Sequence, residues 1–293
     1  MAEAIYAGVE LGGTKCVLTL AADKDRILAQ EIVATTEPEV TLNAIEAILM
    51  RWHDRKPVRS LGIASFGPVD LNRKSPTFGH ITTTSKLRWS NTDVGQRLEK
   101  RLGVPMSFDT DVNGAAFAEM RWGAGQGMRD FAYITVGTGV GVGLIANNQS
   151  MTGFLHCEMG HLRTRRFPGD DWPGACPFHG DCVEGLASGS ALKARFAGRS
   201  LDRIGPDDPI WDNVASTIAQ LCHAIACTAA PHAIAIGGGV MERQPHLLAR
   251  IQPLLVESLN GYFNLPDDYV RAPGLGAKAG PLGSIALALD AVA

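Results

Sequence analysis

The chain has 293 residues, a length typical of about two domains. Its 27 Lys or Arg and 30 Asp or Glu give a formal net charge of −3. This charge gives no case for binding nucleic acid or an anionic membrane. A hydrophobic fraction of 45% is enough for a buried core. No apolar stretch approaches the roughly 20 residues of a transmembrane helix and the start lacks the basic region of a signal peptide, so we expect a cytoplasmic protein with reduced cysteines.

Apolar periodicity and clustered glycines predict alternating strands and helices. In the first half, strands are expected at 4–9, 15–21, 27–34, 58–64 and 104–108, and helices at 42–49, 91–103 and 112–122. In the second half, strands are expected at 131–136, 140–146 and 232–236, and helices at 212–229, 241–259 and 277–291. We expect a small domain at 1–115, with the helix at 277–293 packing back on it, and a large domain at 116–276.

Residues 161–185 are rich in Gly, Pro, Cys and His, and they predict a metal loop. Cys176, His179 and Cys182 fall within one short segment, and His161 precedes them. Two cysteines and two histidines can close a tetrahedral structural zinc site, and a metal would supply the folding energy that this polar loop lacks. A redox thiol pair is the alternative. A catalytic zinc is disfavoured because four protein ligands leave no open position.

Glycine turns between expected strands are candidates for phosphate binding. In Gly12-Gly13-Thr14-Lys15 the backbone N–H groups, the hydroxyl and the ammonium can bind phosphate oxygens. This turn is not a P-loop, because the order is Thr-Lys and a strand follows. Gly137-Thr138-Gly139 lacks the dinucleotide fingerprint and is a second candidate. Gly237-Gly238-Gly239 is a third place where backbone can lie against a ligand. Tight hairpins, or strand-to-helix packing for the third, are the alternatives.

Several carboxylates are placed for chemistry. Phosphoryl transfer to a hydroxyl needs a base for the hydroxyl proton, and Asp111, at an expected strand end, is a better candidate than Asp109. Either aspartate can instead be a helix N-cap. Glu158 and Glu184 flank the metal loop, and with His161 they are suitable partners for sugar hydroxyls. The alternative is that both glutamates are surface residues.

Together these features resemble the ROK family of sugar kinases and repressors, in particular its bacterial zinc-containing fructokinase branch. The resemblance spans nearly the whole chain, and its cysteine segment is the most particular part. The matching segments are Glu10–Lys15, Phe66–Val69, Asp109–Ala115, Thr135–Gly141, Glu158–His161, Cys176–Gly189 and Ile236–Met241.

The resemblance implies an α/β, actin-like (ribonuclease H-like) fold of two domains with an interdomain nucleotide cleft. It implies ATP-dependent phosphorylation of a hexose hydroxyl, with D-fructose to fructose 6-phosphate favoured. Mannose, glucose, allose and N-acetyl hexosamines are the alternative substrates. The implied cofactors are Mg²⁺ with ATP and a structural Zn²⁺, and homodimers are common in the family.

The resemblance also implies roles for individual residues. Asp111 is the implied general base. Nucleotide binding is implied for Gly12, Gly13, Thr14, Lys15, Gly137, Thr138, Gly139, Gly237, Gly238 and Gly239. Sugar binding is implied for Gly67, Pro68, Thr110, Asp111, Glu158, His161 and Glu184. Zinc ligation is implied for His161, Cys176, His179 and Cys182.

Two positions depart from the commonest family pattern. Glu10 stands where many members have an Asp that helps to place Mg²⁺, and the fructokinase branch often has Glu there. Thr110 stands where many glucokinases have Asn, which weakens a glucose assignment. The first departure favours the fructokinase branch and leaves open the role of Glu10 in placing Mg²⁺, and the second does not exclude glucose.

Three other classes of protein fit the sequence less well than a kinase. A sugar-responsive repressor needs a basic helix-turn-helix, and this chain begins directly at its first strand. A silent sugar-binding module would not need Asp111 or the phosphate turns. A zinc dehydrogenase would need the dinucleotide fingerprint that the glycine turns lack.

Overall fold

The computed structural model describes residues 3–197 and 199–293, which divide into two compact units. Unit 1 covers Met1–Gly123, Ser150–His156 and Lys278–Ala293, and unit 2 covers Ala124–Gln149 and Cys157–Ala277. The expected boundary at residue 115 falls inside helix α3 (Asp111–Trp122). Because α3 packs along the C-terminal helix α9 (Ala279–Asp290), the whole of α3 belongs to unit 1.

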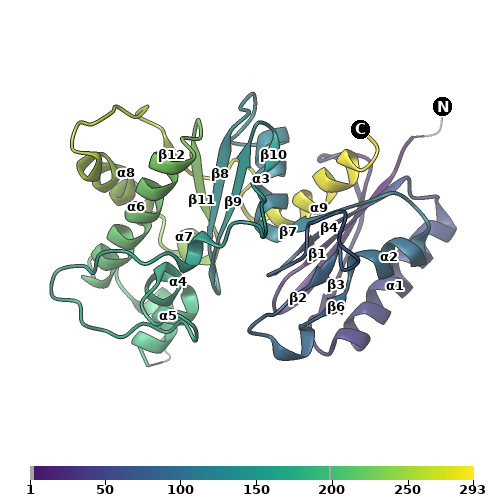
Figure 1. Cartoon of the computed structure of the whole chain (residues 1–293), viewed down its shortest axis with the longest axis horizontal. Coiled ribbons are helices and arrows are strands. Elements are labelled where there is room, and N and C mark those ends of the chain that lie inside the picture. The colour runs from purple at the N-terminus through teal and green to yellow at the C-terminus, as the bar shows by residue number, and fades with distance from the viewer. Residues whose placement is uncertain (1–2, 198) are drawn as a thin grey trace. The chain divides into compact units, whose positions relative to one another are not determined.

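Unit 1 is built on a five-stranded sheet of order β3-β2-β1-β4-β7 (Figure 1). Its strands are β1 (Tyr6–Leu11), β2 (Lys15–Ala21), β3 (Ile27–Ala34), β4 (Ser60–Ser65) and β7 (Met106–Thr110). The first three form an antiparallel meander, whereas β1, β4 and β7 are parallel neighbours. The carboxyl ends of β1, β4 and β7 therefore meet at one edge of the sheet, where ligands bind in open α/β sheets.

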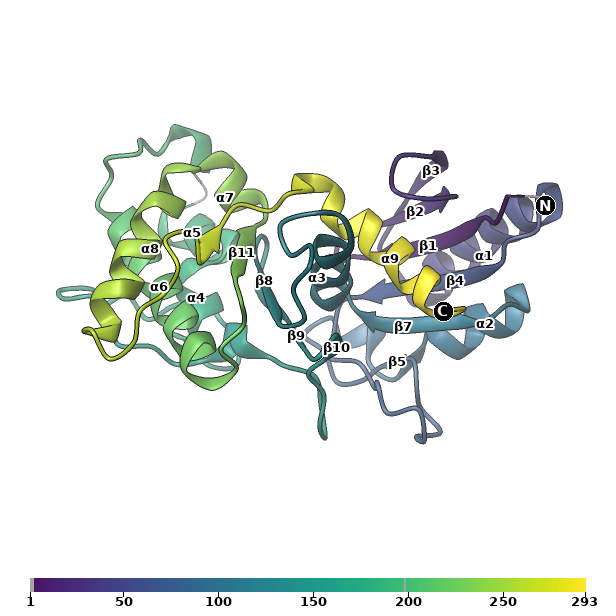
Figure 2. The same cartoon turned by 90° about the horizontal axis from the view of Figure 1, so that it is seen from above.

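Helices cover both faces of this sheet (Figure 2). Helices α1 (Pro38–Arg55) and α2 (Gly95–Leu102) lie on one face, and α3 and α9 lie on the other. Helix α9 approaches the sheet closely at Gly62, which has no side chain. A Cβ at this position would overlap the Ser284 carbonyl oxygen. Helix α9 thus packs on the sheet of unit 1.

Unit 2 repeats the plan with a sheet of order β10-β9-β8-β11-β12. Its strands are β8 (Phe131–Val136), β9 (Val140–Ala146), β10 (Gln149–Ser150), β11 (Ile234–Gly237) and β12 (Val270–Arg271). Its helices are α4 (Val183–Ala187), α5 (Gly189–Arg195), α6 (Ile210–Thr228), α7 (Gly239–Arg243) and α8 (His246–Leu259). Helix α6 lies in the hydrophobic core, with Trp211 and Ile218 fully buried.

Some expected elements differ from the structure. The helix expected from residue 91 begins only at Gly95, because β6 (Thr92–Asp93) pairs with β5 (His80–Ile81). The helix expected at 241–259 is broken between α7 and α8, where Pro245 cannot donate the backbone hydrogen bond that a continuous helix needs.

Short 3₁₀ turns complete the described chain: η1 (Leu87–Trp89), η2 (Met159–His161), η3 (Leu201–Arg203) and η4 (Gly276–Lys278). Among the described residues, no helix has the length and apolar character needed to cross a bilayer.

Candidate active site and metal cluster

Three sequence-predicted features of unit 1 follow its three parallel strands. Leu11 at the end of β1 pairs with Ser65 at the end of β4, which pairs in turn with Thr110 at the end of β7. The next residues in the chain are the Gly12–Lys15 hairpin, the Gly67–Pro68 segment and Asp111. The topology therefore brings the candidate phosphate hairpin, the candidate sugar-binding segment and the candidate base to one edge of a sheet.

The Gly12–Lys15 hairpin has its backbone fixed by a neighbouring threonine. Gly12 N–H donates to the Lys15 carbonyl at 3.1 Å, and the Thr35 hydroxyl donates to the Gly12 carbonyl at 2.7 Å. The Thr35 N–H donates to the Thr14 carbonyl at 3.0 Å. Thr14 and Lys15 are exposed. The hairpin therefore presents a hydroxyl and an ammonium on a rigid turn.

Asp111 opens helix α3, but it is not the cap of that helix. The Thr110 hydroxyl accepts from Asn113 N–H at 3.1 Å and fills the N-cap role. Asp109 is buried and its Oδ1 accepts from Thr110 N–H and from Asn113 Nδ2, both at 2.7 Å. Asp109 Oδ1 is thus occupied by one backbone donor and one side-chain donor, and of the two aspartates Asp111 is the better candidate for chemistry.

Burial raises the pKa of the Asp111 carboxyl to about 6, against the lowering effect of backbone N–H donors including Val112. Val112 N–H donates to Asp111 Oδ1 at 2.9 Å. A carboxylate with a pKa near the working pH is suited to accept a proton and release it again.

Glu10, in β1, is a second carboxylate at this edge. Burial and the charge of Asp111 raise the pKa of Glu10 to about 7, and Lys15 opposes the shift. A Cβ at Gly280 would overlap Glu10 Oε1, so the carboxylate lies against the first turn of α9.

The Gly67–Pro68 peptide bond is cis, and two buried side chains hold the segment. The Thr84 hydroxyl donates to the Gly67 carbonyl at 3.1 Å. His156 Nε2 accepts from Val69 N–H at 3.1 Å. A cavity of about 530 Å³ adjoins this segment and is lined partly by Val69, Thr82 and His156.

In unit 2, the Gly137–Gly139 hairpin joins β8 to β9 as expected. Gly189 N–H, at the start of α5, donates to the Gly137 carbonyl at 2.7 Å. Glu184 Oε2, from α4, accepts from Val140 N–H at 3.1 Å, and a Cβ at Gly139 would overlap this carboxylate. Glu184 therefore lies directly against the Gly137–Gly139 hairpin, the second candidate for phosphate binding.

A cavity of about 410 Å³ opens at this hairpin. Gly137, Thr138 and Ser190 line it together with the cationic side chains of Lys193, Arg199 and Arg243. Polar backbone, the hydroxyls of Thr138 and Ser190 and three cations make a surface suited to a nucleoside polyphosphate.

The Gly237–Gly239 turn follows β11 and leads into α7. Gly238 has a φ of 95°, and a Cβ there would lie 2.7 Å from Val136 N. Close packing on β8 is therefore enough to require this glycine. The turn also lies beside Arg243, which lines the cavity of about 410 Å³. A Cβ at Gly239 would lie 3.1 Å from Arg243 Nη2.

His161, Cys176, His179 and Cys182 come together as the sequence predicts. Their ligand atoms all lie within 4.8 Å of one another. His161 Nδ1 is 3.7 Å from both sulfurs, and Cys176 Sγ is 3.6 Å from His179 Nδ1. Because zinc–sulfur and zinc–nitrogen bonds are about 2.3 and 2.0 Å, these separations fit four ligands around one ion.

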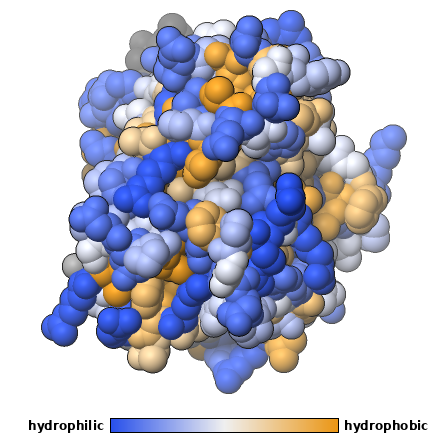
Figure 3. Space-filling model, turned by 90° about the vertical axis from the view of Figure 1, so that its left-hand side faces the viewer, coloured by the Kyte–Doolittle hydropathy of each residue, from blue (hydrophilic) through white to orange (hydrophobic). Residues whose placement is uncertain are grey.

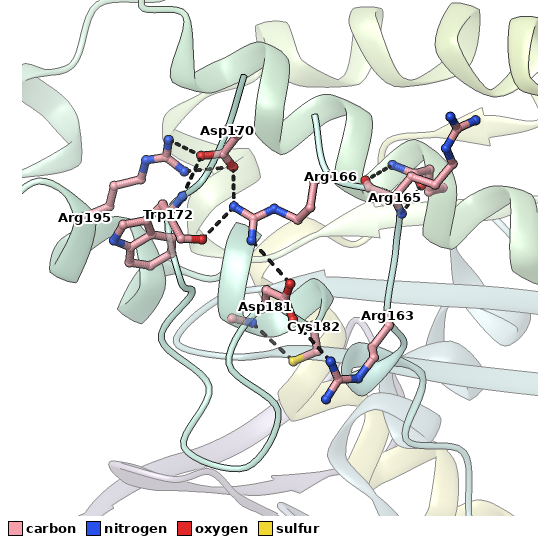
Figure 4. Close-up of polar contacts among 10 residues, drawn as sticks. Arg163, Arg165, Arg166, Asp170, Trp172, Asp181, Cys182 and Arg195 are labelled. Atoms are coloured by element: carbon pink, nitrogen blue, oxygen red, sulfur yellow. Dashed lines mark hydrogen bonds and ion pairs between the residues drawn. The ribbon is translucent and has the colours of Figure 1, made fainter. Parts of the chain in front are cut away.

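The metal loop is tied to its surroundings by backbone and by charge. Cys176 and Gly180 exchange backbone hydrogen bonds of 3.1 and 2.9 Å. Figure 4 shows a line of alternating charges behind the loop, running from Arg163 through Asp181, Arg166 and Asp170 to Arg195. Arg195 belongs to α5, so this network joins the metal loop to the helix that supports the second phosphate hairpin.

The remaining predicted sugar ligand, Glu158, is exposed and precedes η2. Its carbonyl accepts from His161 N–H at 3.0 Å. The geometry turns His161 Nδ1 toward the sulfurs, so that Nε2 is the ring nitrogen remaining for a substrate hydroxyl.

The model of the ROK family matches residues 6–291. The chain belongs to the ROK family.

Named relatives in this family are similar to the chain over almost its full length. It is 42% identical over 296 residues to a fructokinase from Zymomonas mobilis, covering 98% of this chain and 97% of the relative. It is 40% identical over 272 residues to a fructokinase from Lactococcus lactis, covering 92% and 91%. A solved ROK family glucokinase from Streptomyces griseus, in complex with glucose and AMPPNP, is 28% identical with a TM-score of 0.74, covering 98% of this chain and 99% of that one.

The structural similarity extends over both units. This ROK protein therefore has the two-domain, actin-like α/β fold of the family's sugar kinases, as the sequence predicts.

Sequence reasoning did not single out several residues of these sites in this ROK protein. Thr84 and His156 hold the Gly67–Pro68 segment, and Lys193, Arg199 and Arg243 line the cavity at the second hairpin. None of them stands in a glycine turn or a metal-ligand spacing. The one available signal was the concentration of Lys and Arg just after the Glu184–Gly189 segment.

Proposed function

We propose that this protein is an ATP-dependent hexose kinase that converts D-fructose to fructose 6-phosphate, with Asp111 as the general base. The observation that carries the proposal is the position of Asp111 beside the Gly12–Lys15 hairpin edge, with a pKa raised by burial to about 6. Fructose is favoured over glucose by the two fructokinase relatives.

In the proposed reaction, Asp111 accepts the proton of the sugar hydroxyl as the oxygen attacks the γ-phosphorus of ATP. The bond between that phosphorus and the β-bridging oxygen breaks, and ADP leaves with the electron pair. Lys15 and the Thr14 hydroxyl bind phosphate oxygens as negative charge redistributes. Glu10 would help to hold Mg²⁺, and the ion would supply charge neutralisation for the phosphates.

The nucleotide contacts of unit 2 complete the proposal. Thr138 and the Gly137–Gly139 backbone bind phosphate, and the cationic cavity at Lys193 and Arg243 accepts the rest of the nucleotide. The Gly237–Gly239 turn is the proposed adenosine contact, since a flat ring can lie against backbone without side chains.

We further propose that the Cys₂His₂ cluster holds a structural Zn²⁺. His161, Cys176, His179 and Cys182 are its ligands, and the donor set and their spacing fit that ion. The ion supplies folding energy to a loop that has few apolar side chains. His161 then keeps one tautomer and one orientation toward the sugar.

Sugar recognition is proposed for Gly67, Pro68 and Thr110 in unit 1, and for Glu158, His161 and Glu184 in unit 2. Carboxylates and an imidazole can each bind a hydroxyl with good geometry. Glu184 also accepts from Val140 N–H, so one of its oxygens is already committed to the phosphate hairpin.

We also propose that the protein is a homodimer in the cytoplasm. Helix α6 buries one of its faces in the unit 2 core. On the face that Figure 3 shows, hydrophobic side chains lie in small patches among hydrophilic ones.

The experiment is ADP release from Mg·ATP with purified protein across fructose, mannose, glucose, allose and N-acetylglucosamine. Turnover with fructose that exceeds turnover with each other sugar supports the proposal. Turnover with another sugar only would replace the substrate, and no turnover by folded, metal-loaded protein would reject the kinase.

A further inference from the structure

Lys86 places an ammonium group at the first phosphate hairpin. A Cβ at Gly13 would lie 3.0 Å from Lys86 Cε and 3.8 Å from Lys86 Nζ. The side chain therefore reaches across from the segment before η1 and lies against the hairpin backbone. Gly13 leaves space for this approach that any larger residue would restrict.

The backbone of Lys86 is fixed by buried neighbours. Lys86 N–H donates to the Thr84 hydroxyl at 3.4 Å, and the same hydroxyl donates to the Gly67 carbonyl at 3.1 Å. Trp89 N–H donates to the Lys86 carbonyl at 2.8 Å, and Trp89 Nε1 donates to the Thr36 carbonyl at 2.8 Å. Lys86 thus stands between the proposed sugar segment and the proposed phosphate hairpin.

Lys86 brings a positive charge to this hairpin. Among residues 3–197 and 199–293, no carboxylate forms an ion pair with its ammonium, although the side chain is half-buried. Lys15 adds a second ammonium to the same hairpin. Two cations at one glycine turn repel each other unless an anion lies between them, and a phosphate is the anion that such a turn accommodates.

We propose that Lys86 binds the terminal phosphoryl group of ATP during transfer, an inference that rests on the proposed kinase function. As the sugar oxygen bonds to the γ-phosphorus, its proton passes to Asp111 and the electron pair of the broken bond stays on the β-phosphate oxygen. Lys86 stabilises the charge on the transferring oxygens throughout. The Lys86 backbone is joined through the Thr84 hydroxyl to Gly67. We therefore expect Lys86 to lie at the end of the nucleotide that faces the sugar.

The competing explanation is that Lys86 only packs its aliphatic stem on Gly13. A stem role predicts that Lys86→Met is nearly harmless, because Met keeps most of the apolar length. A phosphate role predicts a large loss with Met and partial retention with Lys86→Arg, which keeps the charge.

The test compares Lys86→Met, Lys86→Arg and the matched control Lys100→Met, which removes an exposed lysine from α2. We expect Lys86→Met to lower kcat at least ~30-fold with little change in KM for fructose, as loss of a transition-state contact requires. We expect Lys86→Arg to recover part of that loss and Lys100→Met to match wild type.

A second readout does not depend on turnover. Titrations of ATP and ADP without sugar should show that Lys86→Met weakens ATP binding ~10-fold and ADP binding much less, since ADP lacks the γ-phosphate. Equal effects on both nucleotides, or a kcat within about threefold of wild type, would overturn the role of Lys86. An inactive wild type would reject the proposed kinase function, and the ATP and ADP titrations would still decide whether Lys86 binds a γ-phosphate.

Discussion

Burial and the carboxylate of Asp111 together raise the pKa of Glu10 to about 7. Both carboxylates lie at the edge where β1 and β7 end. Removing the charge of Asp111 should therefore lower the pKa of Glu10.

The first prediction concerns stability against pH. A carboxyl with a raised folded-state pKa favours folding while it stays protonated, so this stabilisation is complete below the unfolded pKa of about 4.5 and is lost as pH rises to about 7. Each pKa unit corresponds to about 1.4 kcal/mol. Without Mg²⁺ or ATP, wild type should lose on the order of 1–3 kcal/mol of unfolding free energy over that range, and Glu10→Gln should lose less.

Denaturant melts at closely spaced pH values will measure this difference. Parallel pH profiles for wild type and Glu10→Gln would show that Glu10 titrates normally and is not perturbed.

The cap of α3 gives the second prediction. Thr110→Ala should cost about 1 kcal/mol, because Asn113 N–H loses its acceptor at the helix start. Thr110→Ser keeps the hydroxyl and should restore most of the stability. Chemical denaturation of the two variants compares them directly, and equal stability would mean that the hydroxyl does not cap the helix.

The third prediction concerns the metal cluster. Cys176→Ser should abolish stoichiometric zinc and weaken fructose binding together, because the loop loses the ion that orients His161. Cys227→Ser changes an exposed cysteine outside the cluster and is the control that should keep the zinc. Elemental analysis and calorimetry measure the two properties, and a zinc-free Cys176→Ser with normal sugar affinity would refute the orienting role.

The fourth prediction concerns the charge network behind the loop. Asp170 pairs with Arg195 at 2.7 Å and with Arg166 at 3.0 Å while its side chain is only 5% exposed. Asp170→Asn should cost about 1–3 kcal/mol because two arginines lose their counter-charge. The control Asp171→Asn changes the exposed neighbouring residue and should keep the Tm of wild type. If Asp170→Asn has the same Tm as Asp171→Asn, the network does not contribute to stability.

Much of the fold follows from local pattern. The strands at 15–21, 27–34, 131–136 and 140–146 agree with β2, β3, β8 and β9, because alternation and glycine turns both act over a few residues. The metal cluster was equally predictable, since three of its ligands are close in sequence.

The missed features depend on distant contacts. Asn91–Asp93 reads as a helix start, but Thr92 pairs with Ile81, which no local signal reveals. Lys86 and His156 reach their positions only because irregular segments fold against Gly13 and Val69. The sequence favours Asp111 over Asp109 but leaves open that either aspartate caps the helix, and only the structure assigns the cap to Thr110.

The most direct test of the account is the kcat of Asp111→Asn with Mg·ATP and fructose. We predict a fall of about 10²-fold or more with fructose affinity largely kept, and a wild-type activity that rises with pH through about 6 as Asp111 loses its proton. Turnover by Asp111→Asn at close to the wild-type rate would contradict the assignment of Asp111 as the base.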